Sequence, residues 1–333
     1  MATRLSYIFS FDAGGRCVAA TLAWFLVFCV LAGTLPIERE NYYSLPDAKF
    51  SWIKSRLFAE PCASVVFLGS SHTWTGIDPA IIEAGNSNCG KVWNFGTSWQ
   101  GRNLHCVFAR DILDRQPIRD IVFEIGSTEP VLSHRWFSRI CRSGDVFTVA
   151  TAFVFVNECF KVPEVINRNN QSFEVLLSLL VRPGAVFLRQ FIPPVYDGSA
   201  MNRTAGWDPK SIGESRVIKE EVAPLKVYSL LAREKLMMKL YPRGRVAELY
   251  AFSEIARSRG VRLHFLFLPK RGAPLPDSGF FSLLEEMGDV WIPDCSELYR
   301  AEYWHDPEHL NSNGAEVLSR WVAGKLVESI SKH

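Results

Sequence analysis

The segment ASVVFLGSS, residues 63–71, decides the fold class of this chain. Its apolar, β-branched centre is typical of a strand buried on both faces, and the glycine and serines that follow indicate a tight turn. Two runs of the same kind come next, KVWNF at 91–95 and DIVFEI at 120–125. Between these two runs, residues 102–114 carry apolar side chains at helical spacing. Strands that alternate with helices predict a mostly parallel sheet covered on both faces.

The same alternation returns near the C-terminus. A stripe of apolar residues at 246–256 predicts a helix, 261–268 predicts a fourth strand, and 290–293 predicts a short fifth strand. The chain then ends in a helix with an apolar stripe, which we expect Asn313 to cap. The expected fold is therefore α/β, with three layers and about five parallel strands.

Residues 131–243, between the third and fourth predicted strands, lack this alternation. They hold two apolar stretches, 146–156 and 173–181, and a part rich in Gly, Pro and Asp from 193 to 213. We expect an insertion or cap here. The stretch 146–156 could instead touch a membrane, although it is too short to span one.

Near the N-terminus, residues 17–37 carry no formal charge, and large apolar side chains dominate them. A membrane-spanning helix needs roughly 20 apolar residues, so this segment is long enough to be an anchor. Because Arg4 and Arg16 precede it, the positive-inside rule places residues 1–16 in the cytoplasm and the rest of the chain outside, in the periplasm. The mixed, polar residues 38–60 are expected to form a stalk.

Two other interpretations of this apolar segment stay open. A signal peptide could be cleaved near Val30-Leu31-Ala32-Gly33, where small residues occur. However, the apolar run is longer than the usual core of a signal peptide. A helix buried in the protein core is the second alternative, which the absence of any charged residue disfavours.

Composition excludes several classes of protein. Hydrophobic residues make up 48% of the 333 residues, which supports a sizeable core and excludes a disordered chain. The net charge of +2 and the lack of a long basic run argue against nucleic-acid binding. Six cysteines follow the anchor, and none is in a C-x-x-C pair, so neither a thiol redox site nor a zinc ribbon is expected. They permit about 15 complete disulfide sets, among which the sequence does not choose.

Small polar or glycine-containing turns follow three of the predicted strands. They are GSSH at 69–72, NFG at 94–96 and GST at 126–128, and a fourth polar segment, HDPEHLN, occupies 305–311. Parallel sheets bind their ligands beyond the carboxyl ends of the strands, so these turns should meet at one edge. Each signal alone is more often an ordinary turn or helix cap.

Together these segments hold the groups that acyl transfer requires. The hydroxyl of Ser71 needs a base to take its proton, and a neutral His309 does this near pH 7. Asp306 would hold the imidazole in the right tautomer, and Pro307 keeps the connecting turn short. We expect backbone N–H groups of Ser71 and Gly96, and a side chain at the third strand end, to bind the tetrahedral oxyanion.

In chain order these blocks resemble the SGNH (GDSL-like) hydrolase superfamily. That family places its serine in a Gly-Asp-Ser turn after the first strand, a position that Ser71 occupies here. Its second-block glycine matches Gly96, and its final Asp-x-x-His matches Asp306 and His309. The third block departs from the family, because Thr128 replaces the asparagine that would give the third oxyanion hydrogen bond. A threonine hydroxyl can still donate one.

The resemblance implies a flavodoxin-like SGNH catalytic domain over 61–333, with the insertion 131–243 unmatched. The Gly-Ser-Ser turn and single anchor are similar to a membrane-anchored acyltransferase-like branch. This branch includes the D-alanyl transfer protein of teichoic acid modification and alginate-type O-acetyltransferases, which act beside a multi-spanning membrane-bound O-acyltransferase. The resemblance therefore implies an acyl-Ser71 intermediate. The acyl group, for example acetyl, would pass to a hydroxyl of a cell-envelope or exported polysaccharide, or to water.

Some residues near the expected site have plainer alternatives. His72 could line the site and bind substrate or simply be exposed, and we favour exposure. Glu129 could bind a substrate hydroxyl or be a solvated loop carboxylate. A metal site that combines His305 and His309 is disfavoured, because Pro307 disturbs the helical turn that a zincin needs. We expect neither a metal nor a cofactor.

A second function class also stays open for the whole chain. A non-catalytic accessory protein could keep the SGNH fold and recruit a membrane-bound O-acyltransferase. The departure at Thr128 favours this alternative, whereas the intact Ser71, Asp306 and His309 favour an enzyme.

Overall fold

The fold is taken from a computed structural model. It describes residues 38–43, 45, 47–58, 63–86, 88–98, 101–126, 134, 136–141, 207, 247–268 and 278–331. The predicted anchor at 17–37, most of the insertion, and the expected site residues Thr128 and Glu129 lie outside these ranges. Within them, no helix is both long enough and apolar enough to cross a membrane.

Five strands form one sheet, and every neighbouring pair runs parallel. Their spatial order is β2-β1-β3-β4-β5, which is consistent with a flavodoxin-like fold. The predicted parallel α/β sheet is therefore confirmed, and each strand lies where an apolar run predicted one. The strands are β1 (Val65–Leu68), β2 (Val92–Asn94), β3 (Asp120–Ile125), β4 (Arg262–Phe267) and β5 (Asp289–Trp291).

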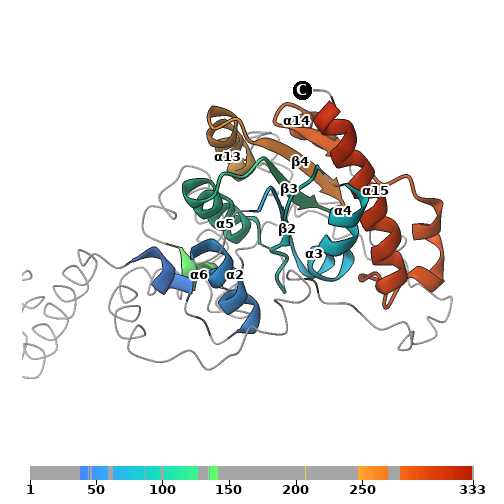
Figure 1. The fold of residues 1–333 in the computed structure, drawn as a ribbon, viewed down its shortest axis with the longest axis horizontal. Coiled ribbons are helices and arrows are strands. Elements are labelled where there is room, and N and C mark those ends of the chain that lie inside the picture. Colours follow the sequence, from blue (N-terminus) through green and yellow to red (C-terminus); the bar gives the residue numbers. More distant parts are fainter. Residues whose placement is uncertain are drawn as a thin grey trace, which may run out of the picture.

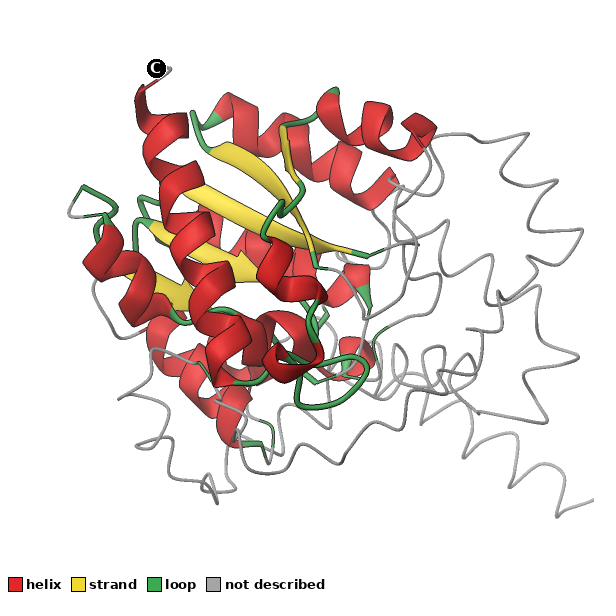
Figure 2. Ribbon diagram, turned by 90° about the vertical axis from the view of Figure 1, so that its right-hand side faces the viewer, coloured by secondary structure: helices red, strands yellow, loops and turns green. Residues whose placement is uncertain are grey.

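Helices cover both faces of the sheet, as Figure 2 shows. In Figure 1, α5 and α13 lie on one side of the strands, and α3, α4 and α15 lie on the other. The described helices are η1 (Arg39–Tyr43), α2 (Ala48–Phe58), α3 (Ser71–Gly76), α4 (Pro79–Gly85), α5 (Arg102–Arg115), α6 (Phe137–Ile140), α13 (Ala247–Ser258), α14 (Ser278–Glu285), η4 (Ser296–Tyr299), η5 (Ala301–Tyr303) and α15 (Ser312–Ser331).

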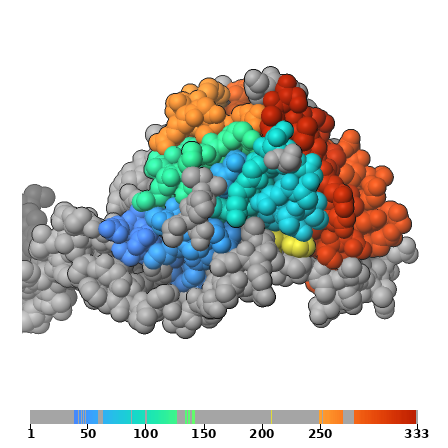
Figure 3. Space-filling model, in the orientation of Figure 1, coloured from blue at the N-terminus to red at the C-terminus, as the bar shows by residue number. Residues whose placement is uncertain are grey.

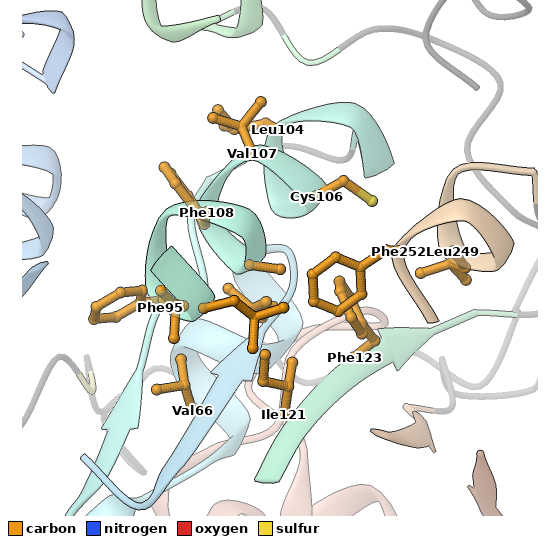
Figure 4. Packing of buried hydrophobic residues seen from close by; sticks show 14 of the residues in the cluster. Val66, Phe95, Leu104, Cys106, Val107, Phe108, Ile121, Phe123, Leu249 and Phe252 are labelled. Carbon is orange, nitrogen blue, oxygen red and sulfur yellow. The ribbon is translucent and has the colours of Figure 1, made fainter. Parts of the chain in front are cut away.

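The main hydrophobic core fills the space between the sheet and helices α2, α5, α13 and α14. Alternate residues of the strands point into it, among them Val66 of β1 and Ile121 of β3, which are partners in the sheet register (Figure 4). Phe123 meets Phe252 of α13 edge to face, with ring centroids 5.5 Å apart. Each fully buried phenylalanine stabilises the fold by roughly 1.5–3 kcal/mol, so this cluster is a main source of its stability.

The opposite face of the sheet is covered by α4 and α15. Val65 and Val122 pack there against Ile82 of α4 and Leu318 of α15. The link between α3 and α4 is fastened to α15, because the backbone N–H of Asp78 donates to Ser319 Oγ at 2.8 Å. Figure 3 shows the cyan surface of α3 and α4 against the red surface of the C-terminal helix. Residues from the two ends of the domain therefore lie side by side.

The expected stalk at 38–60 is wrong over most of its length. Its residues form η1 and α2, and Tyr43 and Phe50 are buried in the main core. Arg39, 4% exposed, forms a buried ion pair with Asp111 of α5, with Nη2 2.6 Å from Oδ2. The apolar side chains of this segment recur at helical spacing, a signal that its polar composition concealed.

Candidate active site

Ser71 lies at the carboxyl end of β1, where the strand order changes direction. It is the first residue of α3, and β1 lies between β2 and β3. Open parallel sheets bind ligands at such a point, because the connections on either side of it leave toward opposite faces of the sheet. The predicted nucleophile therefore occupies the part of this fold that is most suited to a ligand site.

The turn before Ser71 is packed too tightly for any residue but glycine at position 69. A Cβ added to Gly69 would lie 2.0 Å from Thr73 Oγ1 and 2.4 Å from Glu124 Oε2. Ser70 has an extended backbone and caps α3, because its Oγ accepts a backbone N–H from the first turn of the helix. Ser70 is only 2% exposed, whereas Ser71 is partly exposed. Of the two neighbouring serines, only Ser71 is accessible.

Asp306 and His309 lie in a short loop between η5 and α15. Trp304 and Leu310, both buried, close the loop through an isolated antiparallel bridge. Inside it, the backbone N–H of His305 donates to the carbonyl oxygen of His309 at 2.9 Å. The loop is therefore held in shape by its own backbone and by two apolar side chains at its base.

The helix that follows the loop begins one residue after Asn311. Asn311 Oδ1 accepts the backbone N–H of Gly314 at 3.1 Å, so Asn311 is the cap and the expectation of Asn313 is wrong. Its Nδ2 also donates to the carbonyl oxygen of Glu302 at 2.6 Å. One side chain thus fixes the start of α15 against η5 and supports the loop between them.

The loop brings His309 to Ser71. His309 Nε2 lies 2.9 Å from Ser71 Oγ, although 238 positions separate the two residues in the chain. On the other side of the ring, Nδ1 lies 2.8 Å from Asp306 Oδ2 and 3.0 Å from Oδ1. These distances are those of hydrogen bonds, and the arrangement is that of a serine hydrolase triad. The structure therefore brings together the three side chains that the sequence singled out.

Asp306 is surrounded by donors that favour its ionised form. Its Oδ1 accepts the backbone N–H groups of Glu308 and His309, both at 2.8 Å. Burial raises the pKa of Asp306, whereas the hydrogen bonds from the His309 ring and these two N–H groups lower it, and the net pKa is below its ordinary value. An ionised Asp306 keeps the proton on Nδ1 of His309, so that Nε2 accepts from Ser71.

The predicted oxyanion donors are only partly placed. Gly96 packs against the backbone of α3, since an added Cβ would lie 2.4 Å from the nitrogen of Trp74. The N–H of Gly96 donates to Asn94 Oδ1 at 2.9 Å, and this bond must be shared or exchanged when an oxyanion is bound. Thr128, the third expected donor, lies outside the described residues. The oxyanion hole therefore stays a prediction.

His72 is buried, contrary to the exposed position that we favoured. It is 8% exposed, and its ring centroid lies 5.2 Å from that of His309, with the two planes tilted by 56°. Its Nδ1 lies 3.3 Å from Glu124 Oε1. His72 therefore lies behind the triad, and its expected role as a substrate ligand is not favoured by this burial. Glu129, the other expected substrate ligand, is outside the described residues.

Glu124 is the residue at this site that the sequence analysis missed. The N–H and the Oγ–H of Ser70 donate to it at 2.7 Å each, and Thr73 Oγ1 donates at 2.6 Å. Burial raises the pKa of Glu124, whereas His72, Thr73 and Ser70 lower it, and the net pKa is well below its ordinary value. A charged residue inside the apolar strand DIVFEI was the available signal, because a buried carboxylate needs partners.

The insertion contributes one described contact to the helix that carries Ser71. Trp207 Nε1–H donates to the carbonyl oxygen of Thr75 at 2.8 Å. Thr75 in turn donates its hydroxyl to the carbonyl oxygen of Ser71 at 2.9 Å. The segment between the third and fourth strands thus reaches the nucleophile helix.

The loop of Asp306 and His309 is not arranged as a metal centre. Among the residues that the structure describes, no group of three or more His, Cys, Asp and Glu side chains could hold a metal ion. Both ring nitrogens of His309 are instead within hydrogen-bond distance of Ser71 and Asp306.

A scan against protein-family models and a search of curated proteins both find no match. The resemblance to SGNH hydrolases therefore rests on the order of the sequence blocks.

Proposed function

We propose that this chain is an SGNH-type serine acyltransferase or esterase that forms an acyl-Ser71 intermediate. The observation that carries the proposal is the hydrogen-bonded series from Ser71 Oγ through the His309 ring to Asp306. It lies at the carboxyl edge of a parallel sheet, the usual place for a site in such folds. A nucleophile, a base and an orienting carboxylate are the minimum that this chemistry needs.

The first half-reaction would form the acyl-enzyme. His309 Nε2 takes the hydroxyl proton as Ser71 Oγ attacks the carbonyl carbon of an ester donor. The tetrahedral intermediate then collapses, the bond from carbon to the leaving oxygen breaks, and His309 returns its proton to that oxygen. Ionised Asp306 stabilises the imidazolium that exists between these two proton transfers.

The second half-reaction would release the acyl group. An acceptor hydroxyl gives its proton to His309 and attacks the acyl carbon, and the departing Ser71 oxygen takes the proton back. With a carbohydrate hydroxyl the product is an O-acylated polymer, and with water it is a free acid. Transferase and esterase therefore use the same side chains and differ in which hydroxyl reaches the acyl-enzyme.

The acceptor that we propose is a cell-envelope or exported polysaccharide outside the cytoplasmic membrane. Two features of the sequence support this class: the apolar residues 17–37, which we propose as an anchor, and the resemblance to the membrane-anchored acyltransferase-like branch. A multi-spanning membrane-bound O-acyltransferase would deliver the acyl group. No step of this chemistry requires a metal or a cofactor.

A second candidate is a non-catalytic accessory protein with the same fold. This alternative is favoured by two features of the expected oxyanion hole. The Gly96 N–H is bonded to Asn94 Oδ1, and Thr128 stands where the family has an asparagine. A protein of this kind would keep the triad geometry without forming an acyl-enzyme.

Covalent labelling by a fluorophosphonate probe separates the two candidates. The enzyme is expected to be labelled, and Ser71→Ala is expected to remove the label without unfolding the domain. Ser55→Ala is the matched control, because Ser55 lies on α2 and its hydroxyl donates to the carbonyl oxygen of Trp52 on the same helix. Absence of labelling in folded wild-type protein would support the accessory role, and labelling of Ser71→Ala at the wild-type rate would show that the nucleophile is wrongly assigned.

A further inference from the structure

A second carboxylate–imidazole pair lies directly behind the proposed nucleophile. Glu124 Oε1 is 3.3 Å from Nδ1 of His72, the residue that follows Ser71. Both side chains are buried, each with 8% of its surface exposed. Burial of an ionised carboxylate such as Glu124 carries a desolvation cost, and the acyl-transfer steps assign no task to either residue. Their position next to the triad therefore points to a role in the reaction.

Glu124 fixes the chain on both sides of Ser71. On the N-terminal side, it accepts the backbone N–H and the hydroxyl of Ser70 at 2.7 Å each. On the C-terminal side, it accepts the hydroxyl of Thr73 at 2.6 Å and its backbone N–H at 3.3 Å. Hydrogen bonds to an ionised acceptor are about twice as strong as neutral ones. One carboxylate on β3 thus sets the geometry of the turn that presents the nucleophile from β1.

His72 connects this carboxylate to the base of the triad. Its Nδ1 faces Glu124, and its ring lies against the ring of His309. A ring with its centroid 5.2 Å away limits rotation of the His309 imidazole away from Ser71 Oγ. His72 therefore contacts both the orienting carboxylate and the base, and it is the side chain through which Glu124 reaches the triad.

Among the residues that the structure describes, charged and titratable groups near this pair come from the loop of Asp306 and from α5. Asp306 faces His309 from the loop, on the side away from Ser71. From α5, Arg102 Nη2 donates to the carbonyl oxygen of Glu124 at 2.6 Å. His105, also on α5, is fully buried, and burial and then the charge of Arg102 hold its pKa well below the ordinary value, so it is neutral. His72 is thus the group that meets the Glu124 carboxylate on the side of His309.

We propose that Glu124 and His72 are positioning residues for the acylation of Ser71. Glu124 fixes the turn that presents Ser71, and His72, held by Glu124, keeps the His309 ring aligned on Ser71 Oγ and shields it from the carboxylate. The inference rests on the proposed function, since it needs Ser71 and His309 to react. It extends the site from three side chains to five and assigns the two additional ones an indirect role.

The test is the rate constant of fluorophosphonate labelling over about pH 5 to 9, where histidines titrate. His72→Gln keeps an amide donor toward Glu124 but removes the ring from His309. We expect labelling at the optimum to slow by about 10- to 100-fold, because small misplacements of a reacting group are costly. We also expect the midpoint of the pH–rate profile to move to higher pH, since the unshielded Glu124 charge favours protonated His309.

His264→Gln is the matched control. His264 is also a buried histidine within reach of a carboxylate, Asp120 Oδ1 at 3.0 Å, but it lies at the amino end of the strands. The His264→Gln variant should be less stable than wild type. Its labelling rate per folded molecule and the midpoint of its pH–rate profile should be those of wild type. Glu124→Gln is expected to slow labelling at least as much as His72→Gln. The Glu124→Gln variant removes a buried charge and can fail to fold. The result for His72→Gln therefore decides the test.

The experiment distinguishes failure of this inference from failure of the proposed function. If His72→Gln keeps the wild-type rate and midpoint while it loses as much thermal stability as His264→Gln, the pair is purely structural and the inference is overturned. If Ser71→Ala is labelled at the wild-type rate, the proposed function itself fails, whatever His72→Gln does. A slowed and shifted profile in His72→Gln, with no shift in His264→Gln, supports the inference.

Discussion

Strand β3 carries a buried carboxylate at each end, and the two are bound by different partners. Asp120, at the amino end, accepts from Arg119 Nε and Arg262 Nε at 2.7 Å each and lies 3.0 Å from His264 Nε2. Glu124, toward the carboxyl end, is held by hydroxyl and backbone donors of the nucleophile turn and by one histidine. Asp120 is bound mainly by two arginines, one immediately before β3 and one on β4, and Glu124 is bound mainly by hydroxyl and backbone donors next to Ser71.

This difference shows how one strand serves two purposes. A carboxylate that forms ion pairs with arginines from two segments of the chain stabilises the packing of those segments, because its charge is neutralised locally. A carboxylate held by uncharged donors imposes its own geometry on the turn that supplies them. In a parallel sheet the second kind belongs at the carboxyl edge, where ligands bind. We therefore expect changes at the Asp120 end to affect stability and changes at the Glu124 end to affect rate.

The largest effect is expected from removing the base at the carboxyl edge. His309→Ala should lower the rate of fluorophosphonate labelling by at least about 10⁴-fold, because a triad without its base retains little activity. The free energy of unfolding should change by about 0.5 kcal/mol or less, since the side chain is partly exposed (21%). Labelling kinetics and urea unfolding measure the two quantities, and a variant that keeps a tenth of the wild-type rate would contradict the assignment.

The next largest effect is expected at Asp306. Asp306→Asn should slow labelling by about 10²- to 10⁴-fold, because an amide does not hold the Nδ1 proton on His309 as a carboxylate does. Binding of a non-covalent substrate analogue should stay close to wild type, which makes the loss one of rate. Equal losses in rate and in binding would indicate that the loop has moved and that Asp306 does not act on His309 alone.

At the amino edge the expected effect is on stability. Asp120→Asn should lower the free energy of unfolding by about 3 kcal/mol, because it removes the buried carboxylate that accepts from the partly exposed Arg119 and Arg262. The labelling rate per folded molecule should stay unchanged, since Asp120 lies at the opposite end of β3 from the nucleophile turn. Chemical unfolding and active-site labelling of the same preparation test both statements. If Asp120→Asn labels more slowly than wild type but is equally stable, the proposed difference between the two ends of β3 is wrong.

The smallest expected effect is a pH dependence at the same end. Burial raises the pKa of Asp120, whereas hydrogen bonds from His264, Arg262 and Arg119 lower it, to about 2. Because this lies below the ordinary value of about 3.9, the stabilisation is complete above that value and is lost as the pH falls through about 2. The stability difference between wild type and Asp120→Asn should therefore shrink by about 2–3 kcal/mol across this window. Urea unfolding at several pH values measures it, and a constant difference would contradict it.

Most of the fold could be predicted from the sequence because its strands are short, apolar and bounded by turn residues. The five runs that gave β1 to β5 are local signals, and so is the three-residue spacing of Asp306 and His309. The prediction of a stalk at 38–60 was wrong because polar residues conceal the helical spacing of the apolar residues in α2. The cap at Asn311 was missed because Asn313 follows so closely that the pattern does not separate them.

The pair of Glu124 and His72 could not be predicted in the same way. It depends on β3 lying next to β1, although β2 comes between them in the chain. That pairing is set by the topology of the whole sheet, and no local spacing reveals it. The burial of a carboxylate in an apolar strand signals that partners exist, and only the structure identifies them as the residues around Ser71.

We propose that His309 activates Ser71 and not its buried neighbour Ser70. The most direct test is peptide mass spectrometry of the probe-labelled protein, with fragmentation that separates the two serines. We expect the phosphonyl adduct on Ser71 alone, and we expect it to disappear in His309→Ala. An adduct on Ser70, or labelling of Ser71 that does not depend on His309, would contradict it.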